Sequence, residues 1–119
     1  LEAVNGCAFT SHYYGDKPSA AVRAWVARYE ERFLMEPDAL ATLSYDAADL
    51  LFTAIAETGV VAPDLVARTL ETLTFDGIAG SMAFDALHNP VKSMVVLRVE
   101  GGQVRFDGRF DALPQAAEE

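Results

Sequence analysis

The amino-acid sequence predicts an α/β fold with three helices, a few short strands and a β-hairpin near the C-terminus. Apolar residues recur at helical spacing over the first part of the chain, whereas beyond position 93 Val95, Leu97 and Val99 recur at every second position, as in a strand. Two of the predicted helices follow one another directly, although a parallel sheet needs a strand between its helices. The few strands cannot cover three helices, so the sequence predicts part of a larger layered fold.

The first predicted elements are a strand and an amphipathic helix. The segment from Gly6 to Tyr14 is rich in aromatic and β-favouring residues, and it ends in a predicted turn at Gly15 and Asp16. Pro18 fits the first turn of the following helix, where its missing N–H is not needed. The residues expected on the buried stripe of that helix are Val22, Trp25, Val26, Tyr29 and Phe33.

Two further helices are predicted from capping residues and periodicity. Asp38 is a suitable N-cap for a helix that runs to about Thr58, and Gly59 suits its left-handed C-terminal residue. The apolar residues of this helix cover more than one face, so we expect it to pack on two sides. A third helix is expected to begin near Pro63. Its inward residues would be Val66, Leu70 and Leu73.

The remaining third of the chain predicts strands and loops. Residues 75–80 are expected to form a loop, and Met82 to Phe84 a short strand. Gly101 and Gly102 separate two alternating runs, which predicts the hairpin. We expect residues 1–110 to form the folded part and the acidic residues 111–119 to be a loose tail.

The charge balance argues against some classes of partner. Nine Lys and Arg residues against eighteen Asp and Glu residues give a net charge of -9. Phosphate backbones and anionic lipid surfaces repel such a surface, so we expect no nucleic-acid partner. The longest apolar run, from Ala47 to Ala56, contains Asp49, and no run is expected to span a bilayer.

The reactive side chains do not form a known catalytic or metal motif. Cys7 and His12 could pair as nucleophile and base, but at five residues apart on a strand their side chains point to opposite faces. His12 and His88 each lie near a carboxylate in the sequence, yet their spacing does not match a metal-binding motif. We therefore predict no catalytic residue, no metal site and no cofactor, in a protein that is not an enzyme.

Tyr45 lies inside the second predicted helix, next to Asp46. Its ring either belongs to the core, with its hydroxyl group hydrogen-bonded, or forms one edge of a pocket. Spacing alone favours the core, because a buried tyrosine most often just satisfies its hydroxyl group. The pocket interpretation stays open at this point.

Six short strings of residues, spread from Val4 to Phe106, carry a family resemblance. In chain order they are residues 9–13, 37–41, 44–48, 75–80, 84–85 and 89–93, ahead of the hairpin. Their order and spacing resemble the leucine/isoleucine/valine-binding branch of the type I periplasmic binding proteins. The resemblance implies two α/β lobes joined by three chain crossings, with an amino acid or similar solute in the cleft between them.

The resemblance also implies how this chain fits such a protein. Residues 1–110 would be its C-terminal portion, with crossings near Thr10 to Pro18 and near Phe84 to Ser93. The helices would belong largely to the N-terminal lobe and the terminal hairpin to the other lobe. The family's tyrosine at the start of the Tyr-Asp-Ala string packs on the solute and matches Tyr45, which reverses the preference for the core. The family's acidic contact to the amino group of the ligand would lie upstream of Leu1.

The implied function is that of a periplasmic, or otherwise extracytoplasmic, solute-binding component of an ABC importer. It would bind a branched-chain or related amino acid and dock on a membrane permease. Two other classes stay open: a ligand-sensing receptor or regulator domain on the same fold, and a small stand-alone enzyme or interaction domain. Because unpaired strand edges attract partners, we also expect a dimer or a swapped assembly of this chain.

Overall fold

The computed structural model describes residues 2–15 and 19–112. A short 3₁₀ helix at Glu2–Val4 opens the described chain. The helices are α1 (Ala20–Phe33), α2 (Ala39–Thr58) and α3 (Pro63–Thr72). The strands are β1 (Ala8–Ser11), β2 (Phe75–Gly77), β3 (Gly80–Phe84), β4 (Pro90–Lys92), β5 (Met94–Glu100) and β6 (Gln103–Phe110). The mixed α/β class with a C-terminal hairpin is therefore confirmed.

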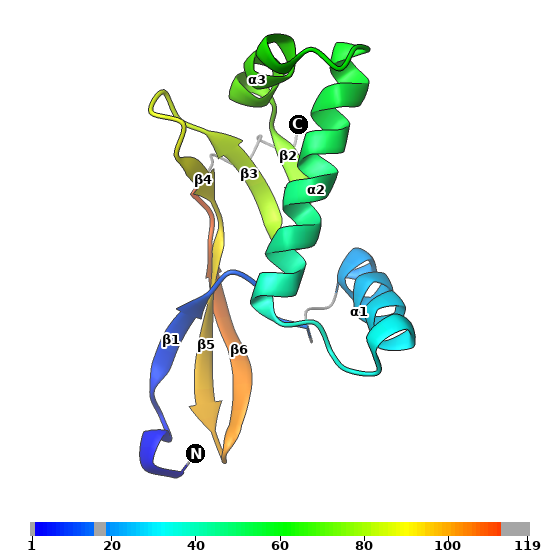
Figure 1. The fold of residues 1–119 in the computed structure, drawn as a ribbon. Helices are drawn as coiled ribbons and strands as arrows, with labels where there is room; N and C mark the ends of the chain where they lie inside the picture. The colour runs from blue at the N-terminus through cyan, green and yellow to red at the C-terminus, as the bar shows by residue number, and fades with distance from the viewer. Residues whose placement is uncertain (1, 16–18, 113–119) are drawn as a thin grey trace, which may run out of the picture.

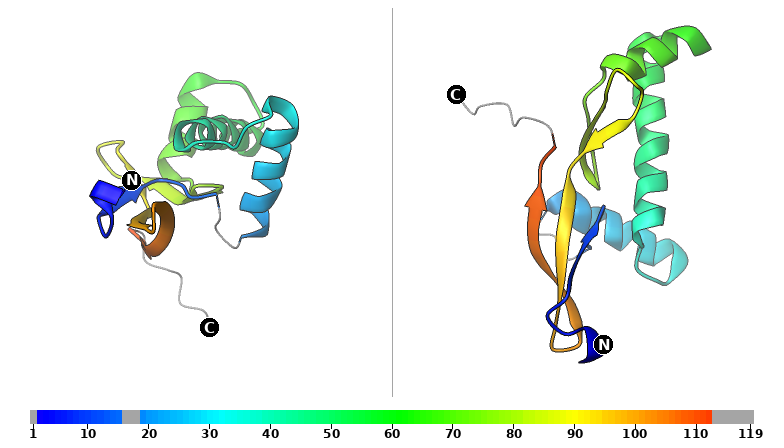
Figure 2. Two further views of the ribbon diagram at one scale, coloured as in Figure 1. Left: turned by 90° about the horizontal axis from the view of Figure 1, so that it is seen from below. Right: turned by 90° about the vertical axis from the view of Figure 1, so that its left-hand side faces the viewer.

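The described strands form two antiparallel sheets of three strands each, in the orders β2-β3-β4 and β1-β5-β6. The first sheet lies beside α2 and α3, whereas the second extends away from the helices (Figure 1). Ser93 is the single residue between β4 and β5. One long run of chain therefore passes from the first sheet to the tip of the hairpin, as the right-hand view of Figure 2 shows.

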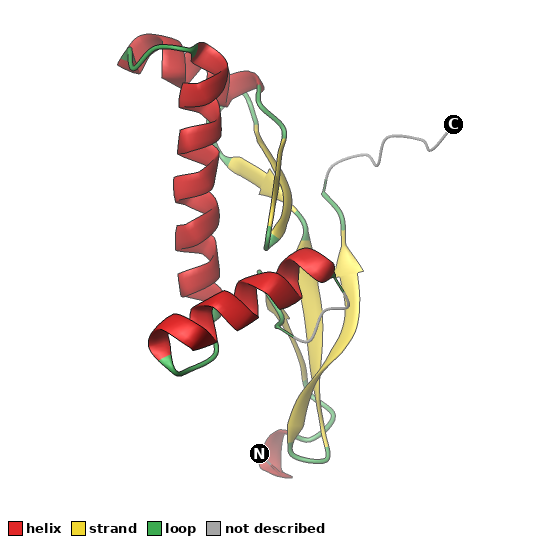
Figure 3. Ribbon diagram, turned by 90° about the vertical axis from the view of Figure 1, so that its right-hand side faces the viewer, coloured by secondary structure: helices red, strands yellow, loops and turns green. Residues whose placement is uncertain are grey.

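Helix α1 buries a shorter stripe than its periodicity predicts. Val22 is 1% exposed and Trp25 is 7% exposed, but Phe33 is 55% exposed. Phe33 lies in the last turn, where its ring packs on Tyr29 at a centroid distance of 4.5 Å. The helix runs across the N-terminal end of α2, so its own C-terminal turn extends past that contact (Figure 3). Pro18, expected in the first turn, lies outside the described residues.

The predicted ends of α2 are confirmed by its caps. The Asp38 side chain accepts a hydrogen bond from the backbone N–H of Ala41 at 2.7 Å. Gly59 ends the helix with a φ of 74°, in the left-handed region that glycine tolerates. Both caps depend on local chemistry, which explains why the sequence was sufficient to locate them.

One side of α2 is packed, which differs from the expected packing on two sides. Its buried residues are Thr42, Asp46, Leu50 and Ala54, one stripe at a spacing of four. Leu40 is 74% exposed and Phe52 is 65% exposed on other faces. By length and composition alone α2 could also cross a membrane, contrary to the sequence expectation. The carboxylate of Asp46, however, binds backbone N–H groups of this chain, so we describe α2 as a core helix with an open face.

The segment 75–80 was expected to be a loop and is instead β2, a tight turn and the start of β3. Phe75 pairs with Met82, and Gly77 pairs with Gly80. Three-residue strands carry too little alternation to be recognised in a sequence, which also explains why β4 was not predicted. The sheet exists because α2 and α3 cover it (Figure 1).

The C-terminal hairpin of β5 and β6 is confirmed. Gly101 and Gly102 have φ values of 57° and 75°, as a type I′ turn requires at both central positions. β5 is the middle strand of its sheet and buries Val95, Leu97 and Val99, the residues that alternate in the sequence. Of the predicted tail at 111–119, residues 113–119 lie outside the described residues.

Candidate ligand-binding site

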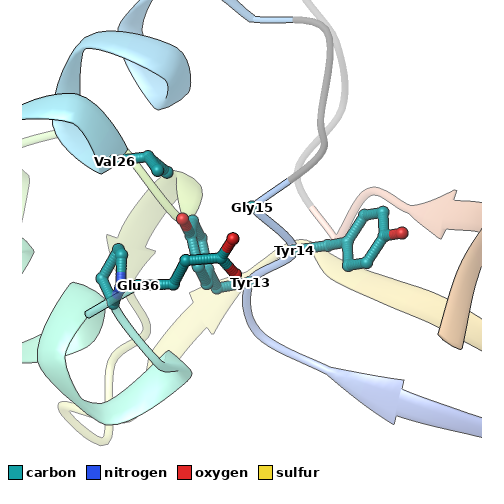
Figure 4. A pocket seen from close by; sticks show the side chains of 6 residues that line it. Tyr13, Tyr14, Gly15, Val26 and Glu36 are labelled. Carbon is teal, nitrogen blue, oxygen red and sulfur yellow. The ribbon is translucent and has the colours of Figure 1, made fainter. Parts of the chain in front are cut away.

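Two neighbouring tyrosines link the helices to the hairpin where the chain leaves β1. Tyr13 is 8% exposed and packs with Val22 and Trp25 in the hydrophobic core. Tyr14 points the opposite way (Figure 4). Its ring stacks on Phe106 at a centroid distance of 6.4 Å, and its hydroxyl group donates to the Val104 carbonyl oxygen at 3.1 Å. This first crossing is therefore anchored on both sides.

The second crossing, at Ser93, is held by side-chain contacts. Ser93 is 5% exposed, and its hydroxyl oxygen accepts a hydrogen bond from Arg109 Nη2 on β6 at 3.0 Å. Gly80 lies against it, because a Cβ at position 80 would be 3.1 Å from Ser93 Oγ. The place where β4 becomes β5 is thus fixed to both sheets.

A buried hydrogen bond fixes α1 against α2. Trp25 Nε1 donates to Thr42 Oγ1 at 3.0 Å, and Thr42 is 0% exposed. The Thr42 hydroxyl group donates in turn to the Asp38 carbonyl oxygen at 3.0 Å. The indole N–H is therefore satisfied inside the core, as buried polar groups must be.

Tyr45 lies half-buried between α1 and α2. Its ring centroid is 4.4 Å from that of Trp25, and the Arg28 guanidinium lies over its ring at 5.6 Å. Arg28 Nη2 also donates to the Tyr45 hydroxyl oxygen at 3.3 Å. Tyr45 lines neither of the two cavities described below. Its contact with a solute stays a prediction.

A small cavity of about 160 Å³ lies at the first crossing (Figure 4). Its lining residues are Tyr13, Tyr14, Gly15, Val26, Glu36 and Pro37. This volume is below the roughly 300–1,000 Å³ that small-molecule sites usually have. We therefore regard it as a gap between α1 and the crossing rather than as the main site.

A second cavity of about 320 Å³ lies between α2 and the sheet β2-β3-β4, and we call it the large cavity. Its volume reaches the lower end of the range for small-molecule sites. Most of its lining is apolar, and the polar side chains are His12, Asp46 and Lys92. Its apolar lining residues include Leu43, Leu50, Phe75, Met82 and Phe84. His12 comes from the first crossing, and Lys92 directly precedes the second.

The charged groups of the large cavity have different surroundings. Asp46 is 8% exposed, and its two carboxylate oxygens accept hydrogen bonds from the N–H groups of Ile78 and Ala79, both at 2.8 Å. Burial lowers the pKa of the Lys92 ammonium below its usual value, and the nearby Asp46 carboxylate raises it in partial compensation. The His12 Nδ1 atom is buried, with no hydrogen-bond partner among the described residues.

The other reactive residues considered from the sequence lie apart from this site. Cys7 is an exposed free thiol. His88 lies in an exposed turn with a φ of 61°, and its ring contacts Glu71 at 3.2 Å. Sequence reasoning did not select Asp46 or Lys92. Asp46 could have been found, because an acid at the spacing of the buried α2 stripe indicates a carboxylate with partners.

Comparisons with known proteins identify the family of this chain. The family model for periplasmic binding proteins matches residues 1–103. A leucine binding protein from Thermotoga maritima is 34% identical over 92% of this chain and 32% of its own, with a TM-score of 0.75. A search of curated proteins finds no match.

Two solute binding proteins of ABC transporters from Rhodopseudomonas palustris are also similar. The one in complex with benzoate is 28% identical over 98% of this chain and 32% of its own, with a TM-score of 0.72. The one in complex with 3,4-dihydroxybenzoic acid is 23% identical over 100% of this chain and 34% of its own, with a TM-score of 0.80. This chain thus spans about a third of the length of these solved structures.

The family match, the shared fold and the resemblance of the six strings agree with one another. The chain belongs to the periplasmic binding protein family, whose similar members are solute-binding proteins of ABC transporters.

Proposed function

We propose that this chain is the C-terminal portion of the solute-binding component of an ABC importer. In the two-lobed protein, a branched-chain or related amino acid would bind in the cleft between the lobes, and the closed form would dock on a membrane permease. The observation that carries this proposal is the family match over residues 1–103, and the large cavity supports it. Its polar residues His12 and Lys92 lie where the described chain leaves β1 toward α1 and where it returns from β4 to β5.

The chemistry of the large cavity supports a small solute with an apolar body. Apolar side chains supply most of its lining, as in typical small-molecule sites, and a few polar groups can fix orientation. The similar proteins are described as a leucine binding protein and as complexes with benzoate and 3,4-dihydroxybenzoic acid. All three compounds carry a carboxyl group, and in leucine and benzoate it is attached to an apolar body. Leucine, isoleucine and valine are therefore the first solutes to test, and benzoate is the next.

Tyr45 does not line the large cavity, and we propose its direct contact with the solute from the family resemblance alone. Its ring is half-buried, and Arg28 fixes its hydroxyl group at the surface. A ring in that position has one face on Trp25 and leaves part of its surface for a ligand. Residues 1–110 are the part of the protein to which we assign this role.

A binding role predicts an extracytoplasmic protein that has no catalytic turnover of its own. No residue that lines the large cavity is a serine or cysteine nucleophile, which supports binding rather than acyl transfer. The expected dimer or swapped assembly of the isolated chain stays a prediction. It would form at the outer edges of the two sheets. The edge strands are β1, β6, β2 and β4, and each has no further strand beside it among the described residues.

Small-angle scattering of the full-length protein with and without solute tests this function. Two lobes that close on a solute should give a smaller radius of gyration when a solute that binds is added. Mass spectrometry of the recovered solute should show it unchanged. A solute that is chemically converted would identify an enzyme, and binding without any compaction would contradict the two-lobed closing mechanism.

A further inference from the structure

Lys92 carries a positive charge that the described residues leave without a direct partner. The ion pairs in the described chain involve His88, Arg98 and Arg109, and Lys92 takes part in neither an ion pair nor a side-chain hydrogen bond there. The ammonium is partly buried in the large cavity, and this burial lowers its pKa. A half-buried ammonium without a partner is a site where an anion is favoured.

His12 supplies a second polar atom without a partner in the same cavity. Its Nδ1 atom is buried and has no hydrogen-bond partner among residues 2–15 and 19–112. Such atoms are rare in native proteins, since nearly all buried polar side-chain atoms have a partner. With the proton on Nδ1, the imidazole would donate a hydrogen bond to an oxygen of a ligand in the cavity.

Asp46 does not neutralise Lys92 by direct contact. Both of its oxygens accept backbone N–H groups of the turn between β2 and β3, which holds the carboxylate against that turn. It still lines the cavity, so its remaining acceptor capacity can receive a donor from a ligand. An α-amino acid offers such a donor in its ammonium group, whereas benzoate has none.

We propose that the Lys92 ammonium and the His12 imidazole together bind the carboxylate of a small apolar carboxylic acid in the large cavity. This inference rests on the proposed function and names the residues that select its solute. The walls formed by Leu43, Leu50 and Phe75 would contact the apolar body of the solute. Because His12 follows β1 and Lys92 ends β4, one carboxylate would bridge two segments that are far apart in the sequence.

Titration calorimetry of the full-length protein with matched pairs of solutes tests this proposal. Each pair contains an acid and its amide: L-leucine with L-leucinamide, and benzoate with benzamide. We expect the wild type to bind at least one acid about tenfold or more tightly than its amide. Lys92→Met should lower the affinity for that acid by about tenfold or more and leave the affinity for the amide unchanged.

Two further variants control for effects on folding. Lys92→Arg keeps the positive charge and should bind the acid within a few-fold of the wild type. His12→Leu should weaken binding of the acid more than binding of the amide. Thermal melts of each variant show whether it is folded. If Lys92→Met fails to fold, His12→Leu decides by the same comparison of acid and amide.

The outcomes separate this inference from the proposed function. If the wild type binds an acid and Lys92→Met binds it equally well, the inference is wrong and the solute-binding function stands. If the wild type binds an acid and its amide with equal affinity, the inference is also wrong, and the solute-binding function again stands. If the wild type binds none of the acids, both the inference and the proposed function fail. Binding of leucine but not of benzoate would identify the solute as an α-amino acid. Binding of benzoate but not of leucine would identify it as an aromatic acid.

Discussion

Gly77 lies so close to the Asp46 carboxylate that a Cβ at position 77 would be 2.6 Å from Asp46 Cγ. Real side chains do not approach this closely, so position 77 has room only for hydrogen. The close approach lets the backbone N–H groups of Ile78 and Ala79 reach the carboxylate. This contact joins α2 to the sheet β2-β3-β4 and forms one wall of the large cavity.

Gly77→Ala is therefore expected to destabilise the fold. The added methyl group must displace the Asp46 side chain or the backbone of β2, which costs about 1–3 kcal/mol in a packed site. Chemical denaturation would measure the change in the free energy of unfolding. Gly108→Ala is the matched control, because a Cβ there has no heavy atom within 4 Å. Equal stabilities of the two variants would contradict the close contact.

Asp46→Asn should lower the free energy of unfolding by about 1–3 kcal/mol. The amide has one oxygen, so its NH₂ group would face one of the two backbone N–H groups that the carboxylate now binds. Asp49→Asn, at an exposed position of the same helix, is the control. If both substitutions cost the same, the buried hydrogen bonds of Asp46 do not stabilise the fold.

Thr42→Val removes the hydroxyl group that accepts from Trp25 Nε1 and nearly preserves side-chain volume. The indole N–H would be left buried without its acceptor, at a cost of about 1–3 kcal/mol. A double-mutant cycle with Trp25→Phe isolates the pair. We expect Thr42→Val to cost much less when position 25 is phenylalanine. A purely additive cycle would mean that this hydrogen bond does not couple α1 to α2.

Leu34→Gly should stabilise the protein by about 1 kcal/mol. Leu34 is the C-cap of α1 with a φ of 56°, in the left-handed region, and it is 91% exposed. Glycine removes the steric cost of that conformation, while little buried apolar surface is lost. Leu34→Ala removes the same exposed side chain and keeps a Cβ, so it should bring no such gain. A lower melting temperature for Leu34→Gly than for Leu34→Ala would contradict the conformation of this cap.

Local chemistry determined how much of the fold could be predicted. The caps Asp38 and Gly59 and the turn at Gly101 and Gly102 depend on neighbours a few residues away, and all were located from the sequence. Pairing of β1 with β5 joins Ala8 to Arg98, which no local pattern encodes. In the small sheet β2-β3-β4 only the part of β3 from Met82 to Phe84 was predicted, and β2 and β4 were missed because short strands are stabilised by the elements that cover them.

The candidate site was less accessible to prediction than the fold. His12 was considered as a metal ligand or a catalytic base and was part of a family string, but its environment depends on residues far away in the sequence. Lys92 was part of a family string, but nothing near it in the sequence indicates that its ammonium is half-buried. Tyr45 was selected through the resemblance alone. The periodicity of its helix indicated a buried position, and the structure places the ring against Trp25.

Calorimetric titration of wild type and Tyr45→Ala, each as full-length protein, tests the solute-binding account most directly. The panel is leucine, isoleucine, valine and benzoate, with thermal melts of both proteins alongside. We predict that the wild type binds at least one of these solutes. Tyr45→Ala should bind it more weakly per folded molecule, because about 25 cal/mol is lost for each Å² of apolar contact with the solute.

The melts distinguish a ligand contact from a core residue. Tyr45 is only half-buried, so Tyr45→Ala should cost less stability than the roughly 3–5 kcal/mol typical of a fully buried large aromatic residue. A variant that melts far lower and yet binds as tightly would make Tyr45 a core residue. A wild-type protein that binds no solute in the panel would contradict the proposed receptor function itself.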